Sequence, residues 1–407
     1  MKAIFVVQGE GRGHLTQALA LKRIFEREGH QVVEVLVGKS KAREIPKFFS
    51  EQIEAPMELF SSPNFLPSKD NRKVNLMRSI AYNALLVPKY LTSVYFLRKH
   101  IMESGADIVI NFYEVLCGIT CSLFSMGIPE VCVAHQYLFL HPSFKMPGKY
   151  PLAENWLRRF TQLTAAGATA KLALSIRDME DDDEQGIKVV PPLLREKAKT
   201  VVRYHGDYIL GYVLNAGFSR DILKWHEKHP HTKLHFFWDK KDVPAEWKVD
   251  DTLTFHQIDD EKFLQYMAGC KAYACTAGFE SVCEALYMGK PCMMIPAHVE
   301  QQCNAMDAER EMVGVASEDF SMDRLIEFSR EYEEDVEFRM WENHADARIM
   351  AAIENVYLDY YLRKDNAYEK ENDSAFVVAT HPLPAGGKEC IRVFGPILGG
   401  CESGGIG

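Results

Sequence analysis

The classes of protein that this sequence excludes follow from what it lacks. Its 407 residues hold 47 Lys and Arg against 57 Asp and Glu, for a formal net charge of −10. It therefore has no basic surplus, which binding to a nucleic-acid backbone requires. Its ten cysteines show no spacing typical of a metal site, and the closest pairs, Cys117/Cys121 and Cys270/Cys275, have no set of histidines beside them. We expect them to be small apolar residues in a reducing cytoplasm.

A long uninterrupted apolar run is also missing. Residues 108–128 come nearest to the roughly 20 apolar residues of a membrane-spanning helix, but Asn111, Glu114 and two glycines interrupt them. A strand, a short helix and a second strand are the better interpretation. No charged-then-apolar leader is visible before the first strand at residues 3–7. We expect a cytoplasmic protein with at most peripheral contact at the inner face of a membrane.

Strand and helix patterns alternate along most of the chain. One series begins at the first residues and a second begins near Tyr208, with Pro191-Pro192 marking the break between them. Two such series predict an α/β fold of two doubly wound parallel-sheet domains, Rossmann-like, facing each other over a cleft. The expected boundaries are residues 1–192 for the first domain, 200–345 for the second, 346–365 for a long final helix, and 366–407 for a glycine-rich loose tail.

The segment 274–305, ACTAGFESVCEALYMGKPCMMIPAHVEQQCNA, carries the most chemical information. It predicts a strand, a turn at Gly278, a helix, a second buried strand and a polar loop that opens another helix. The free N–H groups at a helix start suit a phosphate. The carboxylate of Glu284 suits sugar hydroxyls, and so do the polar side chains of Glu300, Gln301 and Asn304. A structural alternative stays open, in which Ser281-x-x-Glu284 is only a capping box and Glu280 is a solvated acid of the first turn.

This segment resembles the donor-binding motif of the GT-B glycosyltransferases. It is similar to the branch that holds the UDP-glycosyltransferases and the lipid II-forming N-acetylglucosaminyltransferase. The residues in register with that motif are Gly278, Glu284, Gly289-Lys290-Pro291, Pro296, Glu300, Gln301, Asn304 and Ala305. Plant members place a His where this chain has Thr276, and the acid before Gln is usually Asp rather than Glu. The resemblance implies that Thr276, Gly278 and Ser281 bind the donor diphosphate, and that Glu284, Glu300, Gln301 and Asn304 bind its ribose and sugar.

A second glycine-rich loop, QGEGRGHLTQ, follows the first strand and opens a helix. Its glycines Gly9, Gly11 and Gly13 allow close approach of a ligand, and His14 stands at the helix start. Three interpretations compete: a dinucleotide fingerprint with Glu34 on a ribose, whose glycine spacing does not fit; a structural histidine; and a general base. The loop resembles the Gly-x-Gly-x-Gly-His loop of many GT-B enzymes, which favours the third.

In many of those enzymes an acid after a later strand orients the histidine. The matching stretch here is Asn111–Val115, in which Phe112 replaces the family's Asp. Glu114 is therefore the first candidate to orient His14, and Glu10 is the second.

The resemblance implies an inverting glycosyltransferase of the hexosyltransferase type that needs neither a metal nor a cofactor. The donor would be a nucleotide sugar, with UDP as the expected nucleotide, and the acceptor a hydroxyl compound. The Glu-x7-Glu pattern common in retaining relatives is absent, because Thr276 stands eight residues before Glu284. Basic residues among apolar ones over 64–100 suit either a lipid-linked or anionic acceptor or a plain amphipathic helix. A nucleotide-sugar hydrolase or epimerase, and a non-catalytic binding protein, stay open as alternatives.

Overall fold

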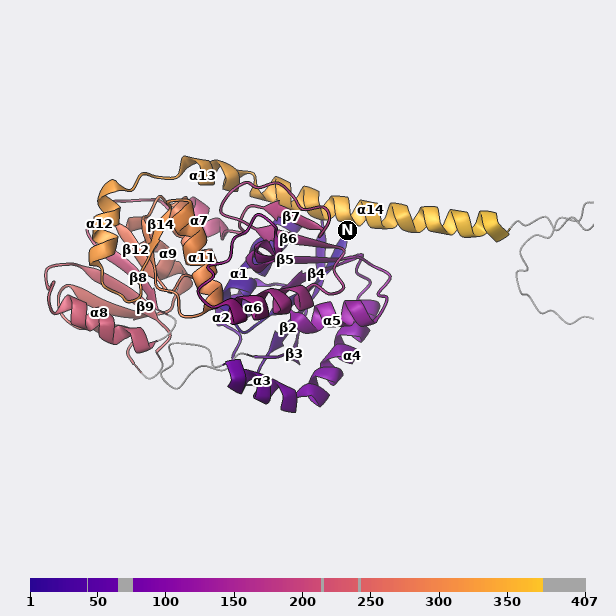
Figure 1. The fold of residues 1–407 in the computed structure, drawn as a ribbon, viewed down its shortest axis with the longest axis horizontal. Coiled ribbons are helices and arrows are strands. Elements are labelled where there is room, and N and C mark those ends of the chain that lie inside the picture. The colour runs from indigo at the N-terminus through magenta and orange to yellow at the C-terminus, as the bar shows by residue number, and fades with distance from the viewer. Residues whose placement is uncertain (42, 65–75, 214–215, 241–242, 376–407) are drawn as a thin grey trace, which may run out of the picture. The chain divides into compact units, whose positions relative to one another are not determined.

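Short apolar runs, each followed by a helical segment, fold into two seven-stranded sheets in this computed structural model (Figure 1). The structure describes the chain except residues 42, 65–75, 214–215, 241–242 and 376–407. The chain divides into two units, Met1–Tyr360 and Tyr361–Gly407, and both sheets belong to the first. The predicted class, α/β with two doubly wound sheets, is confirmed.

The first sheet is parallel throughout and follows the order β3-β2-β1-β4-β5-β6-β7. Its central strands are buried on both faces, which is why their sequences are nearly continuous apolar runs rather than alternating ones. The chain reverses its direction of travel across the sheet between β1 and β4. The strands are β1 (Lys2–Gln8), β2 (Gln31–Lys39), β3 (Met57–Ser61), β4 (Ile108–Phe112), β5 (Glu130–Ala134), β6 (Ala170–Leu174) and β7 (Ile187–Val190).

The second sheet follows the order β10-β11-β9-β8-β12-β13-β14. It is parallel except that β10 runs antiparallel to β11. Here the direction of travel reverses between β8 and β12. The strands are β8 (Ile209–Val213), β9 (Leu234–Trp238), β10 (Glu246–Lys248), β11 (Leu253–Gln257), β12 (Ala272–Cys275), β13 (Cys292–Met294) and β14 (Gly314–Ala316).

Helices cover both faces of the first sheet, because alternate strand residues point to opposite faces. Phe5 and Ile110 pack with α1 and the start of α14, whereas Ile4 and Val109 pack with α4 and α5. The helices are α1 (Arg12–Arg27), α2 (Lys47–Gln52), α3 (Leu76–Leu85), α4 (Val87–Glu103), α5 (Val115–Leu123), α6 (Pro151–Thr164), α7 (Glu196–Thr200), α8 (Ser219–His226), α9 (Asp260–Gly269), α10 (Phe279–Tyr287), α11 (Val299–Arg310), α12 (Asp323–Glu331), α13 (Val336–Asn343) and α14 (Ala345–Ala375), with short 3-10 segments η1 (His135–Leu140) and η2 (Ala216–Phe218).

The last helix differs from its predicted extent. Residues 366–375, expected in a loose tail, continue α14 as far as Ala375. Ala, Glu and Lys in this stretch favour a helix even without a periodic apolar face. The rest of the predicted tail lies outside the described residues. Of the helices described, none is both long and apolar enough to cross a bilayer.

Candidate active site

The candidate site lies where the carboxyl edges of the two sheets meet. His14 follows β1 and Tyr113 follows β4, at the point where the first sheet reverses direction. The turn of Thr276, Ala277 and Gly278 follows β12, at the corresponding point of the second sheet. Ligands of open α/β sheets bind outside these reversal points.

Side chains from the two edges are in direct contact. Gln17 Nε2 donates to Glu280 Oε1 at 2.5 Å, and Gln136 Nε2 donates to Glu300 Oε1 at 3.1 Å. The His135 ring stacks on Phe279, with 4.4 Å between the ring centroids. The predicted donor and acceptor halves of the site are therefore brought together.

The three glycines of the first loop have different surroundings. A Cβ on Gly9 would lie 2.8 Å from Val37 Cγ1 and 2.9 Å from the Gly38 carbonyl oxygen, so Gly9 is needed for packing against β2. A Cβ on Gly11 would meet nothing within 4 Å, and one on Gly13 would lie 3.5 Å from Glu280 Cγ. Gly13 thus faces the second sheet's half of the site, and Gly9 serves the fold rather than a ligand.

His14 is held in one orientation by two neighbours. Its Nδ1 lies 3.1 Å from Gln17 Oε1, and its ring stacks on Tyr113 with 5.4 Å between centroids. Tyr113 has φ of 59°, a left-handed conformation that is costly for a bulky residue and that is found most often at functional sites. Burial lowers the pKa of His14 to about 4, although the bond to Gln17 acts in the opposite direction. The imidazole is therefore neutral at pH 7.

Neither predicted acid is bonded to His14. The Glu114 carboxylate accepts the Ser62 hydroxyl and the Cys117 backbone N–H, and so caps the N-terminus of α5. Burial raises the pKa of Glu114 to about 7. The Glu10 carboxylate accepts from the Ser40 backbone N–H at 2.5 Å. Glu114 stands at a helix start, where unpaired backbone N–H groups lie beside its carboxylate, and one of these is its partner instead of His14.

Gln17 takes the place expected for the acid, and it is held in turn by Glu280. Glu280 is partly buried, not solvated as expected, and its Oε2 has no hydrogen-bond partner among the described residues. Burial raises the pKa of Glu280 to about 8, so this carboxyl group is largely protonated at neutral pH. The hydrogen bonds from His14 to Gln17 and from Gln17 to Glu280 thus connect helix α1, beside the first sheet, with helix α10, beside the second sheet.

The predicted diphosphate site has an uncapped helix start. Gly278 is the N-cap of α10 and offers no side chain to the first-turn N–H groups. Ser281 lies inside the helix, where its hydroxyl donates to the Gly278 carbonyl at 3.3 Å, so the capping-box alternative is wrong. Thr276 is buried, at 2 % exposure, and Ala277 adopts φ of 55°. The geometry leaves the α10 dipole end open to an anion.

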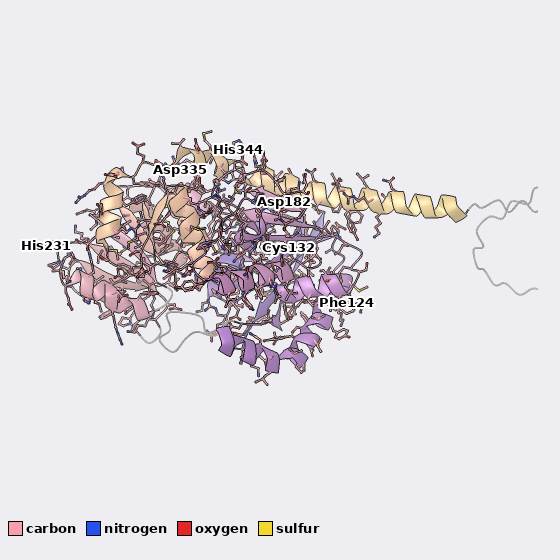
Figure 2. All side chains as sticks on the ribbon, viewed as in Figure 1. Phe124, Cys132, Asp182, His231, Asp335 and His344 are labelled. Carbon is pink, nitrogen blue, oxygen red and sulfur yellow. The ribbon has the colours of Figure 1, made fainter. Side chains whose placement is uncertain are left out.

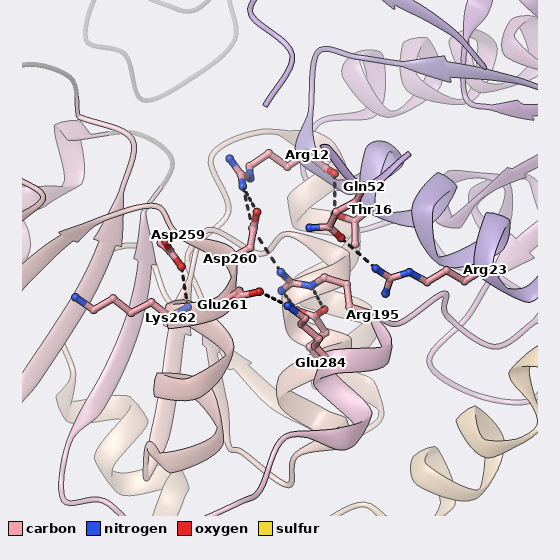
Figure 3. Close-up of polar contacts among 11 residues, drawn as sticks. Arg12, Thr16, Arg23, Gln52, Arg195, Asp259, Asp260, Glu261, Lys262 and Glu284 are labelled. Carbon is pink, nitrogen blue, oxygen red and sulfur yellow. Dashed lines mark hydrogen bonds and ion pairs between the residues drawn. The ribbon is translucent and has the colours of Figure 1, made fainter. Parts of the chain in front are cut away.

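Glu284 already has a partner in this structure. Arg195 Nε and Nη2 each donate to one of its carboxylate oxygens at 2.6 Å. Arg195 Nη1 also lies 3.4 Å from Asp260 Oδ1, and Arg12 Nη2 donates to both Asp260 oxygens at 2.8 and 2.9 Å (Figure 3). The carboxylate predicted for ribose therefore belongs to a four-residue ionic network that reaches from α1 to α10.

The polar residues of α11 divide into two groups. Gln301 Oε1 accepts from the Ala297 N–H at 2.8 Å, and Asn304 Nδ2 donates to the Ala277 carbonyl at 3.0 Å. These two side chains hold the loops around the site. Glu300 instead faces the first sheet's half, 3.4 Å from His135 Nε2, and burial raises its pKa to about 7.

The region predicted to shape an acceptor pocket is only partly described. Arg72 and Lys73 lie outside the described residues. On α4, Tyr90, Val94, Leu97 and Ile101 form the buried face while Arg98 and Lys99 are exposed. Leu91, Tyr95 and Met102 of the same helix are exposed as well, so both interpretations stay open there.

Several site residues escaped the sequence analysis: Gln17, His135, Gln136, Arg195 and Asp260. His135 and Gln136 directly follow the buried strand β5, and polar residues at a strand's carboxyl end are a usable signal. Arg195 and Asp260 carry no such signal, because their partners are distant in the sequence.

A model described as Glycosyl transferase family 1 matches residues 1–331. The chain belongs to this family. The glycosyltransferase matches no curated protein.

Solved structures with a similar fold include several described as glycosyltransferases. The Arabidopsis thaliana enzyme UGT89C1 complexed with UDP superimposes with a TM-score of 0.59 and 13% identity, over 88% of this chain and 99% of that one. The glycotransferase of kitacinnamycin gives 0.57 and 16%, over 89% and 98%. VinC in complex with DTDP gives 0.53 and 15%, over 89% and 100%. At these identities the structural likeness shows only the GT-B fold. The family match shows that the protein is a glycosyltransferase.

Stability of this glycosyltransferase should fall as pH rises from 6.5 to about 8. Glu280, with a pKa of about 8, keeps its proton in the folded chain there, whereas the unfolded chain has already lost it. Higher pH then favours unfolding, by about 1–2 kcal/mol from Glu280 alone. Three further buried carboxyls with pKa values of about 7 act in the same direction: Glu114, Glu300 and Glu342. Urea unfolding at pH 6.5 and 8.5 measures the loss.

The variant Glu280→Gln should reduce that loss, because it removes one titrating group. The histidines act in the opposite direction. Burial lowers the pKa of His14, His256 and His298 to about 4, so rising pH stabilises the fold through them until it passes the unfolded value of about 6.5. This contribution is the same in wild type and Glu280→Gln, so the comparison of the two proteins removes it. An equal pH dependence in wild type and Glu280→Gln would contradict the assignment.

Proposed function

We propose that this glycosyltransferase moves a sugar from a uridine or thymidine diphosphate donor to a hydroxyl acceptor, with inversion at the anomeric carbon and without a catalytic metal. Support for the donor class comes from similar structures described as complexed with UDP and with DTDP. The acceptor is a small hydroxyl compound by analogy with UGT89C1, whose structure is also described with quercetin. In this proposal residues 200–345 bind most of the donor, and residues 1–192 bind the acceptor.

The observation that carries the proposal is the environment of His14. Gln17 Oε1 lies 3.1 Å from Nδ1 and accepts its hydrogen, which leaves Nε2 with a free lone pair. That tautomer can remove a proton from an acceptor hydroxyl as it attacks the anomeric carbon. A donor diphosphate nearby would raise the pKa of His14 from about 4 toward the working pH, because an anion favours the protonated imidazole.

The leaving diphosphate is stabilised by the fold itself. The uncapped start of α10 presents backbone N–H groups and a positive dipole end where negative charge develops. Inversion is favoured because no second carboxylate stands at Thr276, the position that would complete the retaining pattern.

A donor panel tests this function directly. We expect UDP- or TDP-sugars to raise the melting temperature, since a ligand that binds only the folded state stabilises it. Incubation with a set of small phenolic and alcoholic acceptors should then yield a glycoside with inverted anomeric configuration. Donor consumption at equal rates with and without acceptor would support a hydrolase instead.

Gln17→Ala should lower turnover by about tenfold or more and leave the donor affinity nearly unchanged. Without Gln17 the His14 ring loses the acceptor at Nδ1 that selects its tautomer. Gln17→Glu is the matched control, because a carboxylate can still accept the Nδ1 hydrogen and should retain more activity. A higher KM together with a normal kcat would contradict a positioning role.

Divalent ions should not affect transfer. The dipole end of α10 takes the role that Mg²⁺ has in metal-dependent enzymes. We expect equal initial rates with added Mg²⁺ or Mn²⁺ and after free ions are chelated during the assay. A strict requirement would instead indicate a metal site at the acidic run of residues 180–184, which is largely exposed and includes Asp182 (Figure 2).

A further inference from the structure

A compact group of cysteine and glutamate side chains lies between helix α5 and strand β5 of the first sheet. Cys117 and Cys121 stand one helical turn apart on the same face of α5, and Glu130 begins the strand β5. The ligand atoms of these three residues all lie within 4.8 Å of one another. Cys132 follows on β5, with its Sγ 3.6 Å from Glu130 Oε1, and lies inside the first sheet's half of the molecule (Figure 2).

The carboxylate of this group is incompletely satisfied. Glu130 is 2 % exposed, and its Oε1 accepts from Asn111 Nδ2 at 2.8 Å and from the Cys117 and Cys132 thiols at 3.5 and 3.6 Å. Its Oε2 has no hydrogen-bond partner, and no ion pair to Glu130 occurs in the described part of the chain. Burial of a carboxyl oxygen without a partner is costly, so a cation beside this oxygen would be stabilising.

We propose that Cys117, Cys121 and Glu130 bind a thiophilic cation of the Zn²⁺ type, with Cys132 as a fourth potential ligand. On a tetrahedral zinc, bonds of about 2.3 Å to sulfur and about 2.0 Å to oxygen place those two atoms roughly 3.5 Å apart. Cys117 Sγ lies 3.5 Å from Glu130 Oε1. Two thiolates balance the charge of a divalent ion, and the carboxylate brings the net charge of the site to −1.

The surroundings resemble the outer shell of a metal site. Asn111 Nδ2 bonds to Glu130 and also to the Glu114 and Thr164 carbonyls, which fixes the carboxylate in place. Cys121 is half-buried and offers a path of entry. The ion would tie α5 to β5, behind the segment that carries Tyr113, and would have a structural role separate from sugar transfer. Because Cys117 and Glu130 are buried, we expect the ion to dissociate slowly compared with the time of an activity assay.

Zinc analysis of the full-length protein tests this site. Cys390 and Cys401, outside the described residues, are first replaced by serine so that they contribute no thiol. We expect about one zinc ion per chain in this background after gel filtration. Replacement by Co²⁺ should produce a thiolate-to-metal charge-transfer absorption.

Single substitutions then identify the ligands. Cys121→Ser and Glu130→Gln should each weaken zinc binding by more than the roughly 10–100-fold that loss of an outer-shell contact causes. Cys270→Ser, a buried cysteine of the second half whose thiol donates to the Met267 carbonyl, should bind zinc as the parent does. Cys121 is the most exposed of the group, so its variant should fold.

Three results would overturn the proposal: less than stoichiometric zinc with no cobalt charge-transfer band, zinc binding unaffected by Cys121→Ser, or a Cys117–Cys121 disulfide found by mass spectrometry under native alkylation. Each of these would leave the glycosyltransferase assignment untouched.

Discussion

Replacement of His14 by alanine should lower turnover by roughly 10²-fold or more while donor affinity stays nearly intact. Nε2 of this ring is the proposed base, and the neutral side chain contributes little to binding a diphosphate. The measurement is the single-turnover rate at saturating donor, set beside donor affinity from calorimetry. His14→Gln is a second variant that fills more of the same space without a base.

The matched control is His231→Ala, an exposed histidine remote from the site (Figure 2). It should leave both quantities unchanged. Normal turnover in His14→Ala would place the base elsewhere, with His135 as the next candidate because of its position opposite Glu300. A loss of donor affinity without loss of rate would assign the glycine loop to the nucleotide instead.

Glu284→Ala should destabilise the fold and also weaken donor binding. Arg195 donates to both oxygens of a carboxylate that is 1 % exposed, whereas the Arg195 side chain is itself 21 % exposed. Removal of Glu284 leaves Arg195 with only the longer contact to Asp260 Oδ1 at 3.4 Å, which should cost about 2–4 kcal/mol of unfolding free energy. If Glu284 also bonds the ribose, donor affinity should fall by about 1.5–3 kcal/mol.

A double-mutant cycle separates these effects. Arg195→Ala, Glu284→Ala and the double variant are unfolded in urea, and a coupling above about 1 kcal/mol confirms the pair. The control is Glu261→Ala, which breaks an exposed pair between Lys197 of α7 and Glu261 of α9 and should cost about 0–1 kcal/mol. Unchanged donor affinity in folded Glu284→Ala would show that this residue is purely structural.

Local patterns explain why the fold was predictable. Each buried strand of a parallel sheet is a short apolar run, and each helix carries its own periodic face, so single segments such as Ile108–Phe112 can be assigned without their partners. The predicted donor segment was recognisable for the same reason. Its strand, turn and two helix starts lie within residues 274–305, and chain continuity alone holds them near one another.

Side-chain partners could not be predicted in this way. Gln17 and Glu280 are 263 residues apart, Gln136 and Glu300 are 164 apart, and Arg195 and Glu284 are 89 apart. Nothing local to Glu280 distinguishes a solvated first-turn acid from a buried one. The predicted role of Glu114 was wrong for the opposite reason. Its carboxylate accepts from the Cys117 N–H, only three residues away at the start of α5, and not from His14.

The sequence alone determined the α/β class, the alternation of strands with helices in two series, the position of His14 at the start of α1, and the turn at Gly278 that opens α10. These depend on backbone propensity and on residues a few positions apart. The tertiary structure decided what each polar side chain does there: Gln17 rather than Glu114 at His14, Arg195 on Glu284, and Glu130 beside Cys117 and Cys121. The reason is physical, since a carboxylate or amide takes whichever donor the folded chain brings within about 3 Å, and that proximity arises only after the two sheets pack.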